Sequence, residues 1–272
     1  MPELPEVQTV LDTLAVLIKD RRITNVRVSY PNIIDHDLND FKTRLVGEHF
    51  RSFKRRGKYL IFELDTISLL SHLRMEGKYY YTNDPKIINN KHVHVIFELD
   101  DGKSLIYHDV RKFGRMELIS KNPVYNFKKL GLEPFDEKLD YEYLKLKFNN
   151  HRCIKENLLD QSIIAGIGNI YADEILFKAK IHPESIAFKL KKKHISAIID
   201  ASREILNAAI INGGTTIRSY TSSLGVDGKF QLFLKVHMQK DKKCTCCDTV
   251  IQKIKLKGRG TYFCKKCQKK II

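Results

Sequence analysis

The residues at the start of the chain have the types that a covalent reaction needs. The chain begins Met-Pro-Glu-Leu-Pro-Glu-Val, and removal of Met1 would leave Pro2 with a free secondary amine. An α-amino group has a pKa of about 7.7–8.0, so a useful fraction is uncharged at neutral pH and can attack a carbonyl carbon. A secondary amine can form only an iminium, which at a sugar C1′ would favour elimination of the 3′-phosphate. Glu3 lies beside this amine and is the natural general acid or base for moving protons at the sugar.

The segment behind the amine is predicted to be an amphipathic helix. Apolar residues recur at helical spacing from Val7 to Ile18, and Pro5 suits a first helical turn because its missing N–H has no partner to lose there. The positive end of the helix dipole disfavours an ammonium group ahead of it, while Glu6 offsets that effect and can accept hydrogen bonds from free N–H groups. A plain capped helix start explains the same residues, and on spacing alone it is the simpler interpretation.

Five of the six cysteines lie near the end of the chain in a pattern that indicates metal binding. Cys244 and Cys247 form one Cys-x₂-Cys pair, and a second pair follows after sixteen residues, Cys264 with Cys267. Because a long cytosolic chain gives little reason for disulfides, we predict one structural zinc ion. Cys246 can compete with a neighbour for the metal, but the x₂ spacing of both pairs favours the four cysteines named first.

A hairpin is predicted between the two cysteine pairs. Residues 250–256 alternate apolar and polar side chains, and Gly-Arg-Gly at 258–260 makes a turn. This pattern places Arg259 at the tip, where its planar guanidinium suits geometric recognition of phosphate.

A predicted loop with a basic run, Lys-Arg-Arg-Gly-Lys at 54–58, leads directly into a strand-like segment. It has two interpretations. The run is either a solvated sheet edge that deters aggregation, or a group of cations near the active amine, with Lys58 as a proton donor or phosphate contact.

Two further segments, 71–77 and 109–115, each end a predicted strand and run into a glycine. Taken alone, Met75 and Phe113 are most simply core residues. In a DNA-binding protein, an exposed Met or Phe beside an arginine can act as a wedge between base steps. Arg111 would then donate to the Watson–Crick edge of the base left without a partner.

The charge of the chain points to a polyanionic partner. Lys and Arg number 48 against 32 Asp and Glu, which gives a net charge of +16 over 272 residues. Residues 240–272 hold 11 Lys or Arg and 2 Asp or Glu, so this short segment carries +9 of that charge. The sequence contains no apolar run of 18 residues and no basic-then-apolar leader, and we therefore expect a cytosolic protein.

The periodicity predicts an α+β protein in three parts. After the first helix, short strands separated by turns predict an antiparallel β-sandwich or barrel-like domain. The predicted strands are 22–30, 59–64, 67–73, 78–81, 92–99, 104–108 and 116–119. The pattern then becomes helical, with predicted helices at 141–148, 154–161, 170–180 and 190–212. We therefore divide the chain into a catalytic domain at 1–130, a helical domain at 131–235 and a zinc finger at 236–272.

Two connections in the helical part are candidates for ligand contact. Residues 164–169, Ile-Ala-Gly-Ile-Gly-Asn, turn tightly between helices, with Asn169 placed to cap the next helix. A helix N-terminus suits a DNA phosphate, although a plain interhelical turn explains the same residues. Residues 215–229 are polar, contain glycine and are long for a simple connection, so they either close over an extruded base or link to the zinc finger.

Taken together, these segments resemble the bacterial formamidopyrimidine-DNA glycosylase family, in order and over the whole chain. The matching segments are the Pro-Glu-Leu-Pro-Glu start, Arg-Gly-Lys-Tyr-Leu at 56–60, residues 71–77 and 109–114, Gly-Ile-Gly-Asn-Ile-Tyr at 166–171, and the four-cysteine pattern. The resemblance implies a bifunctional base-excision repair enzyme that binds damaged duplex DNA. Such an enzyme removes oxidised purines, chiefly 8-oxoguanine and formamidopyrimidines, and then cuts the strand by β,δ-elimination. It also implies a helix-two-turn-helix, a zinc ion and a monomer.

The resemblance assigns roles to the residues already singled out. Pro2 would be the Schiff-base nucleophile, Glu3 a proton donor at the sugar, and Lys58 a proton donor during β-elimination. Arg259 corresponds to the family's zinc-finger arginine, which contacts phosphate and is assigned to δ-elimination.

Other correspondences concern DNA binding. The residues that fill the gap left by the flipped base correspond to Met75, Arg111 and Phe113. Family DNA-contact positions correspond to His72, His92, Lys155 and Asn169. Residues 215–229 correspond to the loop near the extruded base. Lys112 and Ser219 stand where other members often have Arg and Asp, and the second difference leaves the details of damage recognition open.

Two alternative functions remain at the level of sequence. An endonuclease VIII-type glycosylase shares the fold and the Pro2 chemistry but prefers oxidised pyrimidines; it typically starts Pro-Glu-Gly, so Leu4 favours the purine enzyme. The set Met75, Arg111 and Phe113 also favours the purine enzyme. A zinc-ribbon DNA-binding protein without catalysis is the other alternative, and the intact catalytic residues argue against it.

Overall fold

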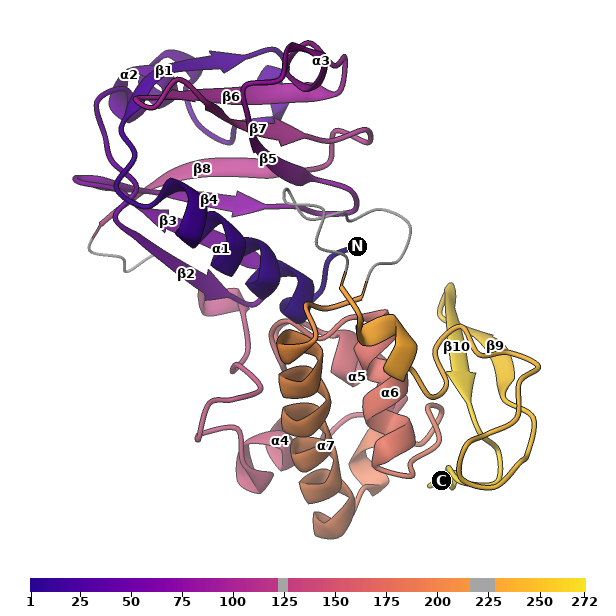
Figure 1. Cartoon of the computed structure of the whole chain (residues 1–272). Coiled ribbons are helices and arrows are strands. Elements are labelled where there is room, and N and C mark those ends of the chain that lie inside the picture. Colours follow the sequence, from indigo (N-terminus) through magenta and orange to yellow (C-terminus); the bar gives the residue numbers. More distant parts are fainter. Residues whose placement is uncertain (122–126, 216–227) are drawn as a thin grey trace. The chain divides into compact units, whose positions relative to one another are not determined.

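The computed structural model describes residues 1–121, 127–215 and 228–272 (Figure 1). The chain divides into two compact units, which are residues 1–126 with 213–228, and residues 127–212 with 229–272. Residues 216–227 of the predicted loop at 215–229, Ser219 among them, lie outside the described residues. In the described ranges, no helix is both long and apolar enough to cross a membrane.

The first unit is a sandwich of two four-stranded antiparallel sheets, as Figure 1 shows. One sheet has the strand order β1-β6-β7-β5 and the other the order β2-β3-β4-β8. The strands are β1 Ile23–Val28, β2 Ser52–Arg56, β3 Tyr59–Glu63, β4 Ile67–His72, β5 Lys78–Thr82, β6 Val93–Leu99, β7 Ser104–His108 and β8 Arg115–Ser120. The helices of this unit are α1 Leu4–Ile18, α2 Leu38–Leu45 and α3 Pro85–Ile88, with a 3₁₀ turn at Pro31–Ile33.

The core of the first unit joins both sheets and α1. The apolar stripe of α1, which includes Val7, Leu11 and Leu14, is fully or almost fully buried, and the helix packs beside β2 and β3. Between the sheets, the ring of Phe62 meets the ring of Tyr79 edge to face at 5.7 Å. This packing confirms the predicted antiparallel sandwich and fixes both ends of α1 against it.

The structure contains three elements that the periodicity does not predict, namely α2, α3 and β2. In β2 no side chain is fully buried, so the sequence lacks the alternation that marks a strand. The interpretation of residues 54–58 as a loop is therefore wrong in part, because Lys54, Arg55 and Arg56 end a strand and only Gly57 and Lys58 form the turn to β3.

The second unit combines four helices with the zinc hairpin. The helices are α4 Tyr141–Lys147, α5 Ile154–Leu159, α6 Asn169–Lys178 and α7 Lys192–Ile211, with 3₁₀ turns at Phe127–Lys129, Ala187–Lys189 and Phe230–Phe233. The hairpin consists of β9 Gln252–Leu256 and β10 Arg259–Phe263. Helix α6 is buried from Tyr171 to Phe177 because α7 and β10 both pack against it. The zinc hairpin thus shares a compact unit with the helices, and the predicted α+β class is confirmed.

Candidate functional site

The N-terminal residues are held in place by the first turn of α1. Pro2 and Glu3 are buried, whereas the side chain of Met1 is exposed. Glu6 Oε2 accepts the N–H of Glu3 at 2.9 Å, which confirms that Glu6 satisfies a free N–H group at the helix start. Glu6 Oε1 accepts both the N–H of Thr215 at 2.8 Å and its hydroxyl at 3.0 Å, a link that the sequence does not reveal. One buried carboxylate therefore fixes the backbone that carries the amine and the chain 209 residues further on.

Lys58 lies in the β2–β3 turn and is only 6% exposed. The next residue, Tyr59, pairs with His72 across β3 and β4, and their rings meet edge to face at 4.6 Å. By contrast Lys54 is exposed and pairs with Glu63 at 2.5 Å. The two interpretations of the basic run thus separate by residue: Lys54 fits a solvated edge, whereas Lys58 is a buried cation beside His72.

His72 is a neutral hydrogen-bond acceptor in this environment. Burial, together with the nearby charges of Arg74 and Lys58, lowers the pKa of His72 to about 3. Its Nδ1 accepts the N–H of Arg74 at 2.9 Å, so in the neutral ring the proton resides on Nε2. His92, another predicted contact, is half-buried with its ring 5.6 Å from that of His108.

The predicted wedge residues occupy two turns that connect the sheets. Met75, half-buried, lies in the connection from β4 to β5, and Phe113, 47% exposed, lies in the connection from β7 to β8. The exposed Arg111 places its guanidinium 4.7 Å from the centre of the Phe113 ring. An aromatic ring this exposed beside a cation fits a contact surface better than a core position.

In the second unit, Lys155 and Asn169 both reach the zinc hairpin. Lys155 is 1% exposed, and its ammonium donates to Asp173 Oδ1 at 2.6 Å and to Thr261 Oγ1 at 2.8 Å. Asn169 Nδ2 donates to the carbonyl of Gly260 at 3.0 Å. The prediction that Asn169 caps α6 is wrong, since Gly168 is the N-cap and the hairpin carbonyl takes the Asn169 amide instead.

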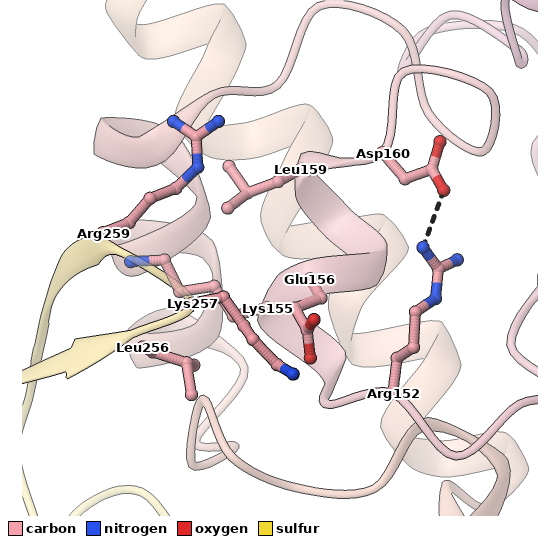
Figure 2. A pocket seen from close by; sticks show the side chains of 8 residues that line it. All are labelled: Arg152, Lys155, Glu156, Leu159, Asp160, Leu256, Lys257 and Arg259. Carbon is pink, nitrogen blue, oxygen red and sulfur yellow. Dashed lines mark hydrogen bonds and ion pairs between the residues drawn. The ribbon is translucent and has the colours of Figure 1, made fainter.

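The prediction that residues 258–260 form the turn with Arg259 at its tip is wrong by one residue, because the turn is Lys257-Gly258 and Arg259 begins β10, where it pairs with Leu256. The two turn residues, Lys257 and Gly258, have φ values of 47° and 79°, which identify the turn geometry that follows the natural twist of a hairpin. Figure 2 shows Arg259 and Lys257 extending from the hairpin beside α5. They line a pocket whose residues are Arg152, Lys155, Glu156, Leu159, Asp160, Leu256, Lys257 and Arg259. Arg152 pairs with Asp160 at 2.9 Å and Lys155 with the buried Asp173, so the exposed Lys257 and Arg259 are the cations of this pocket that suit a phosphate group.

The four predicted cysteines form a centre that fits zinc. Their sulfur atoms all lie within 4.8 Å of one another, with Cys247 to Cys264 at 3.4 Å and Cys244 to Cys267 at 3.8 Å. A tetrahedral zinc ion with Zn–S bonds of about 2.3 Å requires sulfur separations of roughly 3.8 Å. Burial raises the pKa of the Cys244 thiol, so a cation is needed to hold it as a thiolate. Cys246 is exposed and lies outside the cluster.

These features define a zinc-finger protein of the α+β class with a buried proline at the start of its first helix. Three sequence models of known domains match the chain. They are the "Formamidopyrimidine-DNA glycosylase N-terminal domain" over residues 1–116, the "Formamidopyrimidine-DNA glycosylase H2TH domain" over 130–221 and the "Zinc finger found in FPG and IleRS" over 241–270. The chain belongs to the formamidopyrimidine-DNA glycosylase family.

Relatives match over their full length. The formamidopyrimidine-DNA glycosylase of Streptococcus mutans is 46% identical over 281 residues, covering 99% of this chain and 100% of the relative. A solved complex of a Lactococcus lactis FPG mutant with Fapy-dG-containing DNA has a TM-score of 0.93 at 43% identity, and covers 99% of this chain and 100% of that one. A complex of Lactococcus lactis Fpg with DNA containing an abasic site has a TM-score of 0.92 at 43% identity, and covers 98% and 100%.

Proposed function

We propose that this chain is a bifunctional DNA glycosylase and AP lyase of base-excision repair. Its substrates are oxidised purines in duplex DNA, 8-oxoguanine and formamidopyrimidines, and its product is a strand cut by β,δ-elimination. The observation that carries the proposal is the Pro2-Glu3 start, intact and fixed at the beginning of α1, in a chain of this family. The names of the relatives and the damaged DNA in the Lactococcus lactis complexes support the substrate class.

Pro2 and Glu3 carry the first stage of the reaction. The Pro2 nitrogen uses its lone pair to bond C1′ of the damaged nucleotide, while the glycosidic bond breaks and the base leaves with the electron pair. After the nitrogen loses its proton, the C1′–O4′ bond opens to an iminium, and Glu3 supplies the proton that O4′ takes up. Met1 must be removed first, and its exposure makes it accessible.

Lys58 and Arg259 serve the second stage. The iminium acidifies the C2′–H bond, so loss of that proton expels the 3′-phosphate, with Lys58 as a proton donor during this β-elimination. Arg259 contacts phosphate and assists the δ-elimination that releases the 5′-phosphate. Both assignments rest on cations at the family's motif positions, one buried in a sheet turn and one exposed on the zinc hairpin.

The target nucleotide must leave the duplex before Pro2 can reach it, which takes a few kcal/mol of unstacking. Met75, Arg111 and Phe113 fill the gap, and His72, His92, Lys155 and Asn169 complete the DNA-contact set. Lys155 and Asn169 both bind β10, the hairpin strand that begins with Arg259, so their contribution to DNA binding includes holding that strand.

The domain division at 1–130, 131–235 and 236–272 follows from the same proposal, with residues 215–229 as the loop that covers the extruded base. A substrate in chromosomal DNA also implies a cytoplasmic enzyme that works at the nucleoid, and the family resemblance implies that it acts as a monomer.

Borohydride trapping tests the proposal directly, because reduction of the iminium joins protein and DNA permanently. The substrate is a duplex with one 8-oxoguanine opposite cytosine, and a second duplex carries thymine glycol. We expect a trapped complex with the 8-oxoguanine duplex, weaker trapping with thymine glycol, and none when an extra residue precedes Pro2. Pro2→Gly is tested beside them, since it changes the amine from secondary to primary.

Two results would overturn the proposal. Stronger trapping on thymine glycol identifies an endonuclease VIII-type enzyme. Binding to both duplexes without any trapped complex identifies a DNA-binding protein, and every catalytic role above would then be wrong.

A further inference from the structure

Asp109 is a fully buried aspartate with an unusual set of partners. Its Oδ1 accepts the N–H of Arg111 at 2.9 Å, and its Oδ2 accepts the N–H groups of Phe113 and Gly114 at 2.9 and 2.8 Å. The Asp109 carbonyl accepts from His94 Nε2 at 2.8 Å. One carboxylate therefore sets the backbone of residues 109–114, which we call the Arg111 turn.

The Tyr107 hydroxyl joins this turn to a second one. It lies 3.4 Å from Asp109 Oδ2, and its ring is buried against Tyr79 with the centroids 5.2 Å apart. A Cβ built on Gly114 would lie 1.7 Å from this hydroxyl oxygen, and one built on Gly77 would lie 2.2 Å from it. Both glycines are thus needed for close approach, and the hydroxyl is enclosed between the Arg111 turn and residues 73–77, which we call the Met75 turn.

The topology explains why the two turns meet. The Met75 turn runs from β4 to β5, and the Arg111 turn runs from β7 to β8. Since β4 pairs with β8 in one sheet and β5 pairs with β7 in the other, both turns cross the sandwich at the same end. Tyr107, near the end of β7, fills the space between them.

We propose that Asp109 and Tyr107 are positioning residues that hold the Arg111 turn and the Met75 turn in one fixed relation, so that Met75, Arg111 and Phe113 enter the duplex as a single rigid wedge. This inference rests on the proposed function. Exposed turns with large side chains would otherwise lose conformational freedom on insertion, and that loss opposes binding. Three hydrogen bonds from the backbone to one buried carboxylate remove this freedom before DNA arrives.

Asp109→Asn is the test variant, because it keeps the size of the side chain but replaces one acceptor oxygen with an NH₂ group. In either orientation of the amide, this NH₂ group faces at least one of the N–H groups of Arg111, Phe113 and Gly114 and cannot accept from it. The matched control is Asp101→Asn. Like Asp109, Asp101 lies at a sheet turn and accepts a hydrogen bond from the backbone N–H two residues further on, that of Lys103, at 3.1 Å. It also accepts a hydrogen bond from a tyrosine hydroxyl, that of Tyr81. It belongs to neither of the two turns.

Wedge insertion is measured with a duplex that carries an uncleavable abasic analogue and 2-aminopurine beside the unpaired base, since unstacking raises its fluorescence. At saturating protein we expect the native chain and Asp101→Asn to raise the signal equally, and Asp109→Asn to raise it much less. Excision of 8-oxoguanine from duplex DNA should slow about 10- to 100-fold in Asp109→Asn, as expected for a misplaced positioning group. Trapping on a single-stranded abasic oligonucleotide, which needs no wedge, should stay within about twofold of the native chain.

The outcomes separate this inference from the proposed function. No trapping by the native chain means that the proposed function fails. Normal trapping by the native chain, with Asp109→Asn equal to Asp101→Asn in fluorescence and excision, overturns the inference alone. An equal loss on single-stranded and duplex DNA also overturns it, because the residue would then support only the fold.

Tyr107→Phe keeps the test decisive if Asp109→Asn does not fold, since it removes only the hydroxyl. We expect a smaller loss in the same two duplex measurements. If both variants fold, the double variant should be no worse than Asp109→Asn, because the two residues act through the same contact. Additive losses would contradict a shared role.

Discussion

Pro2 and His72 show how position changes the chemistry of a single residue. While Met1 is present, the nitrogen of Pro2 is part of a peptide bond. Removal of Met1 makes this nitrogen a secondary amine just ahead of α1. His72 has an ordinary pKa near neutrality in the unfolded chain, but burial beside Arg74 and Lys58 keeps it neutral in the folded protein. Its neutral state allows it to lie near the Lys58 ammonium without adding a second positive charge.

The lowered pKa of His72 predicts a loss of stability in acid. The unfolded histidine, with a pKa of 6.5, takes up a proton before the folded one, whose pKa is about 3. Stability is therefore fully present above about pH 6.5 and is lost as the pH falls towards 3, by roughly 2 kcal/mol between pH 7 and pH 5. His72→Asn keeps an acceptor for the Arg74 N–H but removes the titrating ring. Between pH 7 and pH 5 its free energy of unfolding should therefore fall by roughly 2 kcal/mol less than that of the native chain.

Denaturant unfolding of the native chain and His72→Asn at both pH values checks this prediction. His151→Asn, at an exposed histidine, is the control and should follow the native chain. Parallel pH curves for His72→Asn and the native chain would show that His72 is protonated in the folded state.

At the scale of elements, the joint between α6 and the zinc hairpin is a buried polar network. One oxygen of Asp173 accepts a hydrogen bond from the Lys155 ammonium, and the other lies 2.7 Å from His237 Nδ1. The Lys155 ammonium also donates a hydrogen bond to the Thr261 hydroxyl on β10. The neighbouring Glu174 accepts hydrogen bonds from the backbone N–H groups of Val236 and His237 at 2.9 and 2.8 Å. The network fixes the strand that begins with Arg259 against a helix.

Lys155→Met should destabilise the second unit by about 3–5 kcal/mol, because it leaves the Asp173 carboxylate buried without its cation. Lys178→Met provides the control, since Lys178 lies on α6, as Asp173 does, and pairs with Glu204 at 2.6 Å, but both side chains of this pair are largely exposed. The control should lose no more than about 1 kcal/mol. Denaturant unfolding measures the loss of stability in both variants. Equal losses would show that the buried pair stabilises the protein no more than the exposed pair does.

At the scale of the whole molecule, the positive charge is concentrated in the segment that contains the zinc centre. Residues 240–272 carry +9 of the net +16, and the exposed Lys257 and Arg259 of this segment line the pocket beside the hairpin. Such a surface binds phosphate with release of counterions, so affinity for undamaged duplex DNA should fall linearly in a plot of log affinity against log salt concentration.

Arg259→Ala should reduce the slope of that plot by about 1, as expected when one phosphate contact is lost. Lys178→Met again serves as control, because its charge is already paired with Glu204. Binding titrations from low to high salt give both slopes. An unchanged slope for Arg259→Ala would mean that this arginine does not contact phosphate.

Local pattern alone was enough to predict several features of this protein. Helical and strand periodicity predicted most of the elements within a few residues, because burial on one face repeats with a fixed period along α1 and the sandwich strands. Cysteine spacing predicted the zinc centre, since two short knuckles bring four sulfur atoms around one ion. The weakly patterned β2 and the short α2 carried no such signal and were missed.

Other features depended on contacts between residues far apart in the sequence. Asn169 had the type of a helix cap, yet its amide binds the Gly260 carbonyl, and Lys155 had the type of a surface cation, yet it is buried beside Asp173. The meeting of the Met75 and Arg111 turns around Tyr107 likewise follows from the pairing of four strands. Periodicity and spacing are properties of neighbouring residues, whereas the partner that a polar group finds, and whether water reaches it, is decided only when distant segments pack together.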